Sequence, residues 1–349
     1  MKGAMIARSP ADWHAKDRQD EPWQHALREV VTNSDELLAL LDLADEASAL
    51  DRRPAFPLRV PRSFVARMRR GERDDPLLRQ VLPALVEAQT QTGFVDDPLG
   101  ESEANKLPGL IHKYAGRVLL VLSGNCAIHC RYCFRRHFPY ADNRPPRAEW
   151  APVFDYIERD PSLHEVILSG GDPLSLSDRR LAEIVDRLAA IAHLRRLRVH
   201  SRLPVVVPQR VTPALVELLA GSRLATSLVI HANHPREIDE TVGTALRPLR
   251  TAGLSLLNQS VLLAGVNDQA DTLAELSERL FAVGVLPYYV HLLDRVSGAA
   301  HFDVPEARAR ALHAALLARL PGYLVPRFVR AVAHAASKIP LGLALADTT

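Results

Sequence analysis

The stretch NCAIHCRYCFRRHFPY, from Asn125 to Tyr140, holds all three cysteines of this 349-residue chain. Cys126, Cys130 and Cys133 follow the spacing C-x3-C-x2-C. Cysteine thiolates hold iron–sulfur clusters, so these three can ligate three irons of a 4Fe-4S cube. The fourth iron of such a cube then lacks a protein ligand and stays open for chemistry.

Two other interpretations of the cysteines remain open at this point. The first is that all three are inert core residues, since free cysteine is often buried. Apolar burial does not predict three cysteines beside Arg131, Arg135 and Arg136, however. The second is a structural zinc site, for which His129 or His137 could supply the fourth ligand. A nucleic-acid surface built on the same arginines is disfavoured by the formal net charge of only +2.

The composition is that of an ordinary globular protein, with 47% hydrophobic and 24% charged residues. No apolar run reaches the roughly 18 residues of a membrane span, and the polar N-terminal stretch does not resemble a secretory signal. Cysteines without spare partners favour a reducing compartment, so we expect a cytoplasmic protein without nucleic-acid or membrane partners.

The N-terminal third predicts helices broken by prolines. Residues 1 to about 22 are polar, and a helix should begin near Asn33, with Glu36 three positions later as in a capping box. The basic run Arg67, Arg69 and Arg70 is expected to be a solvated helix face. We interpret residues 1–112 as a helical extension.

Beyond this extension, short β-rich runs alternate with helical patterns. After the first gap the runs begin roughly 30 residues apart, which is the size of a βα unit. The alternation predicts an α/β fold with a parallel sheet, a partial (βα)6 barrel over residues 113–300 followed by a C-terminal segment over 301–349. Gly284 is the expected stop of the helix that precedes the last strand. The six runs are Val118–Leu122, Glu165–Leu168, Leu197–His200, Ala225–Ile230, Leu254–Leu263 and Pro287–Leu293.

Polar or reactive residues follow or end every one of these strands. In β/α barrels, working residues lie at the carboxyl ends of the strands, so the pattern predicts one active mouth, although strand-end loops are polar in any case. In chain order these residues are the three cysteines, then SGGDPL (Ser169–Leu174), His200 to Arg202, His231 with Asn233 and His234, Asn258 with Gln259, and Asp294.

The cysteine spacing and the SGGDPL element together resemble the radical S-adenosylmethionine (SAM) enzymes. In that family the cluster gives one electron to SAM, and a Gly-Gly-Asp/Glu element receives its methionine ammonium. Six motifs in order resemble, more narrowly, the lysine 2,3-aminomutases, and within them the bacterial branch that makes β-lysine for elongation factor P. These motifs are CRYCFRRHFPY, SGGDPL, HSRLPVVVPQR, LLNQSVLL, PYYVHLLD and ASKIPL.

The resemblance implies a role for each matching residue. Lys338, in ASKIPL, matches the lysine that carries pyridoxal 5′-phosphate (PLP), which makes residues 301–349 a helix and a PLP-binding tail. Arg135 matches the arginine that pairs with the substrate carboxylate, and Asp294 matches an acid that receives the ε-ammonium of lysine. Cys126, Cys130 and Cys133 match the cluster ligands; Gly170, Gly171 and Asp172 match the SAM-binding element; Arg117, His231, Asn258 and Gln259 match polar positions around PLP or SAM.

Taken without the resemblance, several of these residues have ordinary interpretations. A lysine near a C-terminus is usually solvated, Asp294 could pair with the adjacent Arg295, and Arg135 could form a surface ion pair. His231 and His234 could be hydrogen-bonded strand-end histidines.

The sequence departs from the free-lysine aminomutases near its C-terminus. Those enzymes have a second acid seven residues before the PLP lysine, where this chain has Ala331. They also carry C-terminal cysteines for a zinc clip, which are missing here. One acid fewer weakens the capture of free lysine, which agrees with the elongation-factor branch.

The expected activity is therefore an isomerase reaction, the conversion of L-α-lysine to (R)-β-lysine by 2,3-amino migration. The implied cofactors are a 4Fe-4S cluster, SAM and PLP. The implied partners are lysine, an electron donor such as flavodoxin and, indirectly, elongation factor P and its lysyl ligase; a homo-oligomer is possible. The alternatives are an aminomutase that acts on free lysine in catabolism, on glutamate or on arginine, and a zinc-stabilised binding module.

Overall fold

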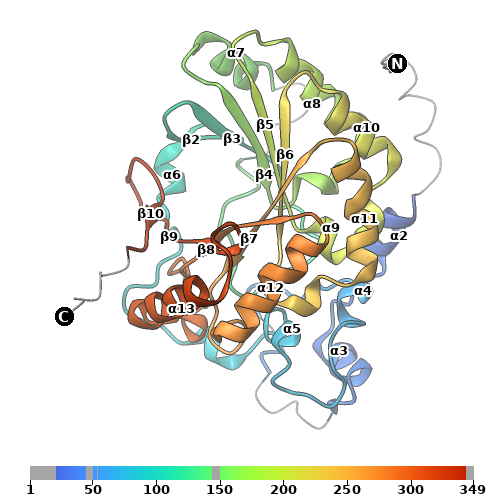
Figure 1. Ribbon diagram of the computed structural model, residues 1–349, viewed down its shortest axis with the longest axis vertical. Helices are drawn as coiled ribbons and strands as arrows, with labels where there is room; N and C mark the ends of the chain where they lie inside the picture. The colour runs from blue at the N-terminus through green and yellow to red at the C-terminus, as the bar shows by residue number, and fades with distance from the viewer. Residues whose placement is uncertain (1–20, 45–49, 53, 144–149, 343–349) are drawn as a thin grey trace.

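A single ten-stranded sheet runs through the part of the chain that the computed structural model describes, residues 21–44, 50–52, 54–143 and 150–342 (Figure 1). Its spatial order is the order of the chain, from β1 at one edge to β10 at the other, so the sheet is open. The strands are β1 (Asn105–Leu107), β2 (Leu110–Tyr114), β3 (Arg117–Ser123), β4 (Glu165–Gly170), β5 (Arg196–Ser201), β6 (Ala225–His231), β7 (Ser255–Val261), β8 (Leu286–His291), β9 (Arg327–Arg330) and β10 (Ile339–Pro340).

The six strands β3 to β8 pair in parallel and confirm the predicted partial barrel. Amphipathic helices connect them, because each helix presents an apolar stripe to the sheet. In α8, Ser177 caps the first turn, and Leu181, Ile184 and Leu188 are buried at helical spacing. Gly284, with a φ of +81°, ends α12 as expected. The helices are α7 (Ala151–Arg159), α8 (Asp178–Ala190), α10 (Pro213–Gly221), α11 (Glu240–Thr251), α12 (Ala270–Ala282) and α13 (Glu306–Arg319).

Short helical turns occupy several strand-to-helix connections. They place the residues after each strand at the carboxyl edge of the sheet. These turns are η4 (Pro173–Ser175), α9 (Leu203–Val206), η5 (Pro208–Arg210), η6 (Pro235–Glu237) and η7 (Ala300–Phe302), whereas η8 (Gly322–Leu324) lies between α13 and β9.

The N-terminal extension differs from the purely helical segment that we expected. It contains α2 (Pro22–Arg28), α3 (Ser34–Leu40), α4 (Arg62–Val65), α5 (Pro76–Arg79), η2 (Leu85–Ala88) and α6 (Glu101–Ala104). The strands β1 and β2, however, also belong to this segment or adjoin it: β2 pairs antiparallel with β3, and β1 pairs antiparallel with β2. Asn33 caps α3 as predicted, accepting from the N–H groups of Asp35 and Glu36.

The extension packs on the barrel through one continuous core. Phe64 of α4 and Leu77 of α5 belong to the same buried apolar cluster as Leu168 of β4 and Leu228 of β6. Arg69 and Arg70 are exposed, as expected of a solvated basic run. Arg67 is the exception, because its Nη1 and Nη2 donate to backbone carbonyls 2.7 and 2.6 Å away across that interface. The division into residues 1–112, 113–300 and 301–349 stays a prediction, and the expected mobile tip and final tail residues lie outside the described ranges.

Candidate active site

The cysteine loop follows β3 and is hydrogen-bonded to the N-terminal extension. Arg59 donates from Nε to the carbonyl of Cys126 at 2.8 Å and accepts the N–H of His129 at 2.9 Å. Farther along the loop, the N–H of Arg131 donates to the carbonyl of Gln80 at 2.8 Å. These backbone contacts fix the course of the loop, so the extension is part of the site's framework.

A buried carboxylate neutralises two arginines of this loop. Glu87 of η2 accepts from Nε of Arg131 at 2.8 Å and from Nη2 of Arg136 at 2.8 Å. Burial acts to raise the pKa of Glu87, but the two guanidinium groups hold it below the ordinary value. Both arginines also lie over the ring of Phe56. They are therefore structural and are not presented to a nucleic acid.

The three thiols are partly buried and electrostatically coupled. Burial raises the pKa of Cys126 well above its usual value and that of Cys133 to about 11, and neighbouring thiolates act in the same direction. The Sγ of Cys130 accepts a hydrogen bond of 2.6 Å from Nη1 of Arg202. Bound iron would supply positive charge that stabilises the thiolates, and its binding would release the thiol protons.

The geometry does not favour a zinc site. Within the described ranges, no three His, Cys, Asp or Glu side chains converge as ligands of a single metal ion. The two candidate fourth ligands contact backbone carbonyls, His129 at Pro57 (2.8 Å) and His137 at Ser297 (3.3 Å). The three thiols interact electrostatically with one another, and cysteine thiolates can each bind a separate iron of a cluster.

The glycines of SGGDPL bring the end of β4 against the cysteine loop. Gly170 has a φ of +122°, and a Cβ added there would lie 2.5 Å from the carbonyl oxygen of Ser123. A Cβ on Gly171 would lie 2.6 Å from the carbonyl oxygen of Asn125. Only glycine fits such contacts, so these residues are required by the packing of the loop itself.

The carboxylate of Asp172 accepts hydrogen bonds from groups of the protein itself. It accepts from the Ser201 hydroxyl at 2.7 Å and from the N–H groups of Arg202 and Leu203 at 2.8 and 3.1 Å, and caps η4 at Leu174. Burial raises its pKa to about 6 against these hydrogen bonds. The carboxylate thus ties the loop after β4 to the end of β5, a role that sequence reasoning missed; its contact with SAM stays a prediction.

Lys338 is half-buried, and its amine reaches the end of β8. Its Nζ is 3.4 Å from each ring nitrogen of His291 and 5.6 Å from the ring centre of Tyr289, both on β8. Burial lowers the pKa of Lys338 to about 8, while the charge of Asp294 opposes that shift. Burial also keeps His291 neutral by lowering its pKa well below the usual value. The amine of Lys338 is therefore easier to deprotonate than the amine of a solvated lysine.

Asp294, in the loop after β8, lies within electrostatic range of Lys338. Burial raises its pKa to about 6, and the nearby positive charges of Lys338, Lys113 and Arg135 act against that shift. The pairing of Asp294 with Arg295 is not observed, because Arg295 reaches the carboxylate of Asp303 at 3.4 Å.

Arg135 is buried and already engaged by an acid that the sequence did not reveal. Its Nε and Nη2 donate to the two carboxylate oxygens of Glu101 at 2.7 and 2.8 Å. Its Nη1 contacts the hydroxyl of Ser169 at 3.1 Å and the carbonyl of Gly170 at 3.3 Å. The pair raises the pKa of Arg135 further, although burial alone would lower it.

A neutral polar cluster lines the wall between β5 and β7. Gln259 lies 2.9 Å from Nε2 of His231 and 3.5 Å from Nδ1 of His200. Burial lowers the pKa of His231 to about 3 and that of His200 well below its usual value. The Nε2 of His200 is buried without a partner, so the wall offers a free polar atom to a bound group.

The other two predicted positions lie apart from this wall. Asn258 directs its amide to the backbone of Ala232 at 2.9 and 3.1 Å, which joins β6 to β7. Arg117 stands at the start of β3, where its guanidinium lies 4.7 Å from the ring centre of Tyr114.

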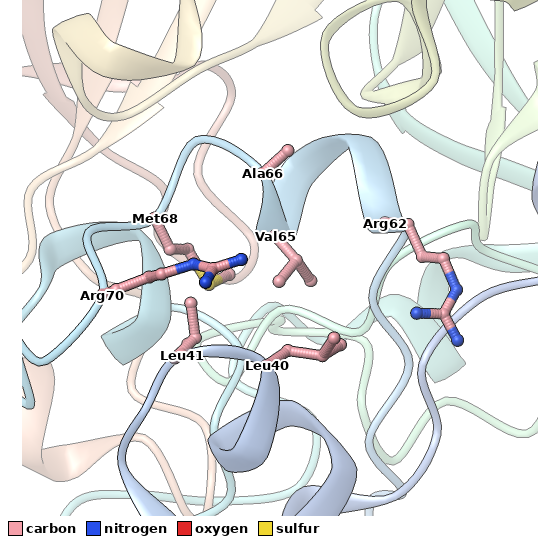
Figure 2. Close-up of a pocket in the computed structure, with 7 residues that line it drawn as sticks. All are labelled: Leu40, Leu41, Arg62, Val65, Ala66, Met68 and Arg70. Carbon is pink, nitrogen blue, oxygen red and sulfur yellow. The ribbon is translucent and has the colours of Figure 1, made fainter.

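A separate pocket of about 300 Å³ lies in the extension between α3 and α4 (Figure 2). Its walls include Leu40, Val65 and Arg70 and contain none of the predicted cofactor-binding or catalytic residues.

Comparisons with known proteins agree with this arrangement. Residues 120–276 match the family model of the radical SAM superfamily. The chain is 51% identical over 328 residues to an L-lysine 2,3-aminomutase of Escherichia coli, covering 93% of this chain and 96% of that one. It is 44% identical to the Haemophilus influenzae protein of that name (92% and 96% covered) and 34% identical to that of Clostridium subterminale (95% and 79% covered).

No helix in the described ranges combines the length and apolar character needed to cross a bilayer.

The cysteine loop, the barrel and the similarity along nearly the whole chain lead to one assignment: this chain belongs to the lysine 2,3-aminomutase family of radical SAM enzymes.

Proposed function

We propose that this isomerase converts L-α-lysine to (R)-β-lysine by 2,3-amino migration, and that the β-lysine modifies a lysine of elongation factor P. The observation that carries the proposal is that the Asp294 carboxylate interacts electrostatically with both Lys338 and Arg135, two residues after the last cysteine of the loop. An amine, an acid and a guanidinium are the groups that a lysine substrate and its PLP carrier need.

We assign the cofactor sites to residues that suit them. Cys126, Cys130 and Cys133 would ligate the cluster, Gly170 to Asp172 would line SAM, and Lys338 would hold PLP. When bound, these groups supply the one-electron chemistry and the amino-group carrier for the migration. His200, with a buried nitrogen lacking a partner, and Gln259 are suited to hydrogen-bond the PLP or SAM.

The protein's own residues would orient the substrate. Arg135 contacts Ser169 and Gly170 at the edge of the cysteine loop, so it would hold the α-carboxylate there. Asp294, whose charge acts on Lys338, would receive the ε-ammonium, and its negative charge disfavours glutamate as substrate.

Two features support the elongation-factor branch over the free-lysine enzymes. Ala331, directly after β9, stands where those enzymes have a second acid for the ammonium. The described part of the chain also lacks cysteines other than the three of the loop. An electron donor such as flavodoxin and a reducing, cytoplasmic setting would keep such a cluster active.

The test is product formation by the reconstituted enzyme. The protein is loaded anaerobically with iron and sulfide, then given SAM, dithionite, PLP and, in separate reactions, lysine, arginine or glutamate. Chromatography and mass spectrometry should find β-lysine alone. An unchanged lysine pool with a full cluster would refute the proposal, and transfer of the product to elongation factor P by its ligase tests the cellular role.

A further inference from the structure

We propose that Arg202 sets the electron affinity of the cluster through its hydrogen bond to Cys130. Its Nη1 lies 2.6 Å from the Sγ of Cys130, and its side chain is 6% exposed. The inference rests on the proposed role of Cys130 as a cluster ligand. Arg202 is thus a positioning residue that acts on the cluster through the sulfur.

The structure orients this guanidinium from both sides. Its Nη2 donates to Oε1 of Gln80 at 2.7 Å and to Oε2 of Glu237 at 3.0 Å. The rings of Phe64 and Tyr132 lie 5.3 and 5.8 Å from its central carbon. Because Nη2 takes the acceptors and the rings limit tilting, Nη1 is left directed at the sulfur.

The backbone of Arg202 is fixed as well. Asp172 accepts its N–H at 2.8 Å and the hydroxyl of the preceding Ser201 at 2.7 Å. Asp172, in the loop after β4, therefore positions Arg202, the residue that contacts Cys130. This is a role for the buried Asp172 carboxylate within the site.

The electrostatic consequence has a definite sign. Reduction adds one negative charge to the cluster, and a cationic donor at a ligand sulfur stabilises that charge. Glu237 is fully buried and offsets part of the cation, but it contacts Nη2 and not the nitrogen that faces sulfur. We expect about a tenfold effect on the reduction equilibrium constant, which is about 59 mV for a one-electron couple.

The test compares Arg202→Met and Arg202→Lys with a matched control, Arg210→Met. Arg210 is likewise a buried arginine, paired with Asp178 at 2.6 Å and stacked on Trp23 at 4.4 Å, without a described contact to any cysteine. Each reconstituted variant is assayed for iron content, melting temperature and the midpoint potential of the cluster by redox titration with electron paramagnetic resonance.

We expect the equilibrium constant for reduction of the cluster to be about tenfold smaller in Arg202→Met, intermediate in Arg202→Lys and unchanged in Arg210→Met. If Arg202→Met alone loses its iron, the midpoint potential of Arg202→Lys decides, because an intermediate value supports the inference and an unchanged value overturns it. An unchanged potential in Arg202→Met, or equal iron loss in Arg202→Met and Arg210→Met, overturns it. A wild-type protein that binds no iron would instead refute the proposed cluster.

Discussion

Arg135 and Glu101 form a two-point ion pair inside the barrel, with Nε–Oε2 and Nη2–Oε1 distances of 2.7 and 2.8 Å. The side chains are 6% and 7% exposed, so water screens the pair weakly. This contact joins α6, on the extension side, to the end of the cysteine loop. It also means that a substrate carboxylate would meet a guanidinium whose orientation is already fixed.

The first prediction concerns this pair. Glu101→Ala leaves a buried guanidinium without its acid, which costs about 3–5 kcal/mol of unfolding free energy. Chemical denaturation of the variant measures the loss. The control is Glu103→Ala on the same helix, whose side chain is 74% exposed and 3.7 Å from His334; it should stay within about 0.5 kcal/mol of wild type. Equal stability of the two variants would contradict the assignment.

The sequence predicted the six central strands because their runs are apolar, rich in β-branched residues and spaced as βα units. It did not predict β9, which has only four residues, or β10, which has two and contains Pro340. Such segments become strands by pairing with a formed neighbour, β9 with β8 and β10 with β9. Local pattern carries no signal of that kind.

Residue types located the site, but they did not give its partners. Glu101 lies 34 residues from Arg135, and Asp172 receives donors from the strand next to its own. Both pairings follow from tertiary packing, which spacing in one sequence does not reveal. A buried arginine does require an acceptor, and that rule could have prompted a search among the acids of the extension.

The second prediction tests Lys338 as the attachment site of PLP. Lys338→Ala should bind iron normally but lose covalent PLP, which borohydride reduction followed by mass spectrometry detects. Lys106→Ala is the control, because Lys106 is an exposed lysine of the edge strand β1. Covalent PLP retained by the Lys338 variant would move the attachment site elsewhere.

The third prediction uses the pKa of Lys338, which burial lowers to about 8. The neutral amine is the nucleophile, so the rate of PLP attachment should rise with pH and reach half its maximum near pH 8. Asp294 raises the pKa of Lys338 by its charge, so Asp294→Asn should move that midpoint to lower pH. Asp303→Asn, whose carboxylate contacts Arg295, should leave it in place. A midpoint near 10, or an upward shift in Asp294→Asn, would be inconsistent with the buried amine.

The last prediction tests the contact between SGGDPL and the cysteine loop. In Gly171→Ala, the new methyl group would lie 2.6 Å from the carbonyl oxygen of Asn125, next to Cys126, so the backbone has to shift. Overpacking of this kind costs about 1–3 kcal/mol, and we expect lower iron content after reconstitution as well as lower stability. Gly221→Ala is the control, since a Cβ there meets nothing within 4 Å and alanine suits the end of α10. If Gly171→Ala bound iron as fully as Gly221→Ala and unfolded at the same denaturant concentration, close packing would not be what requires glycine at this position.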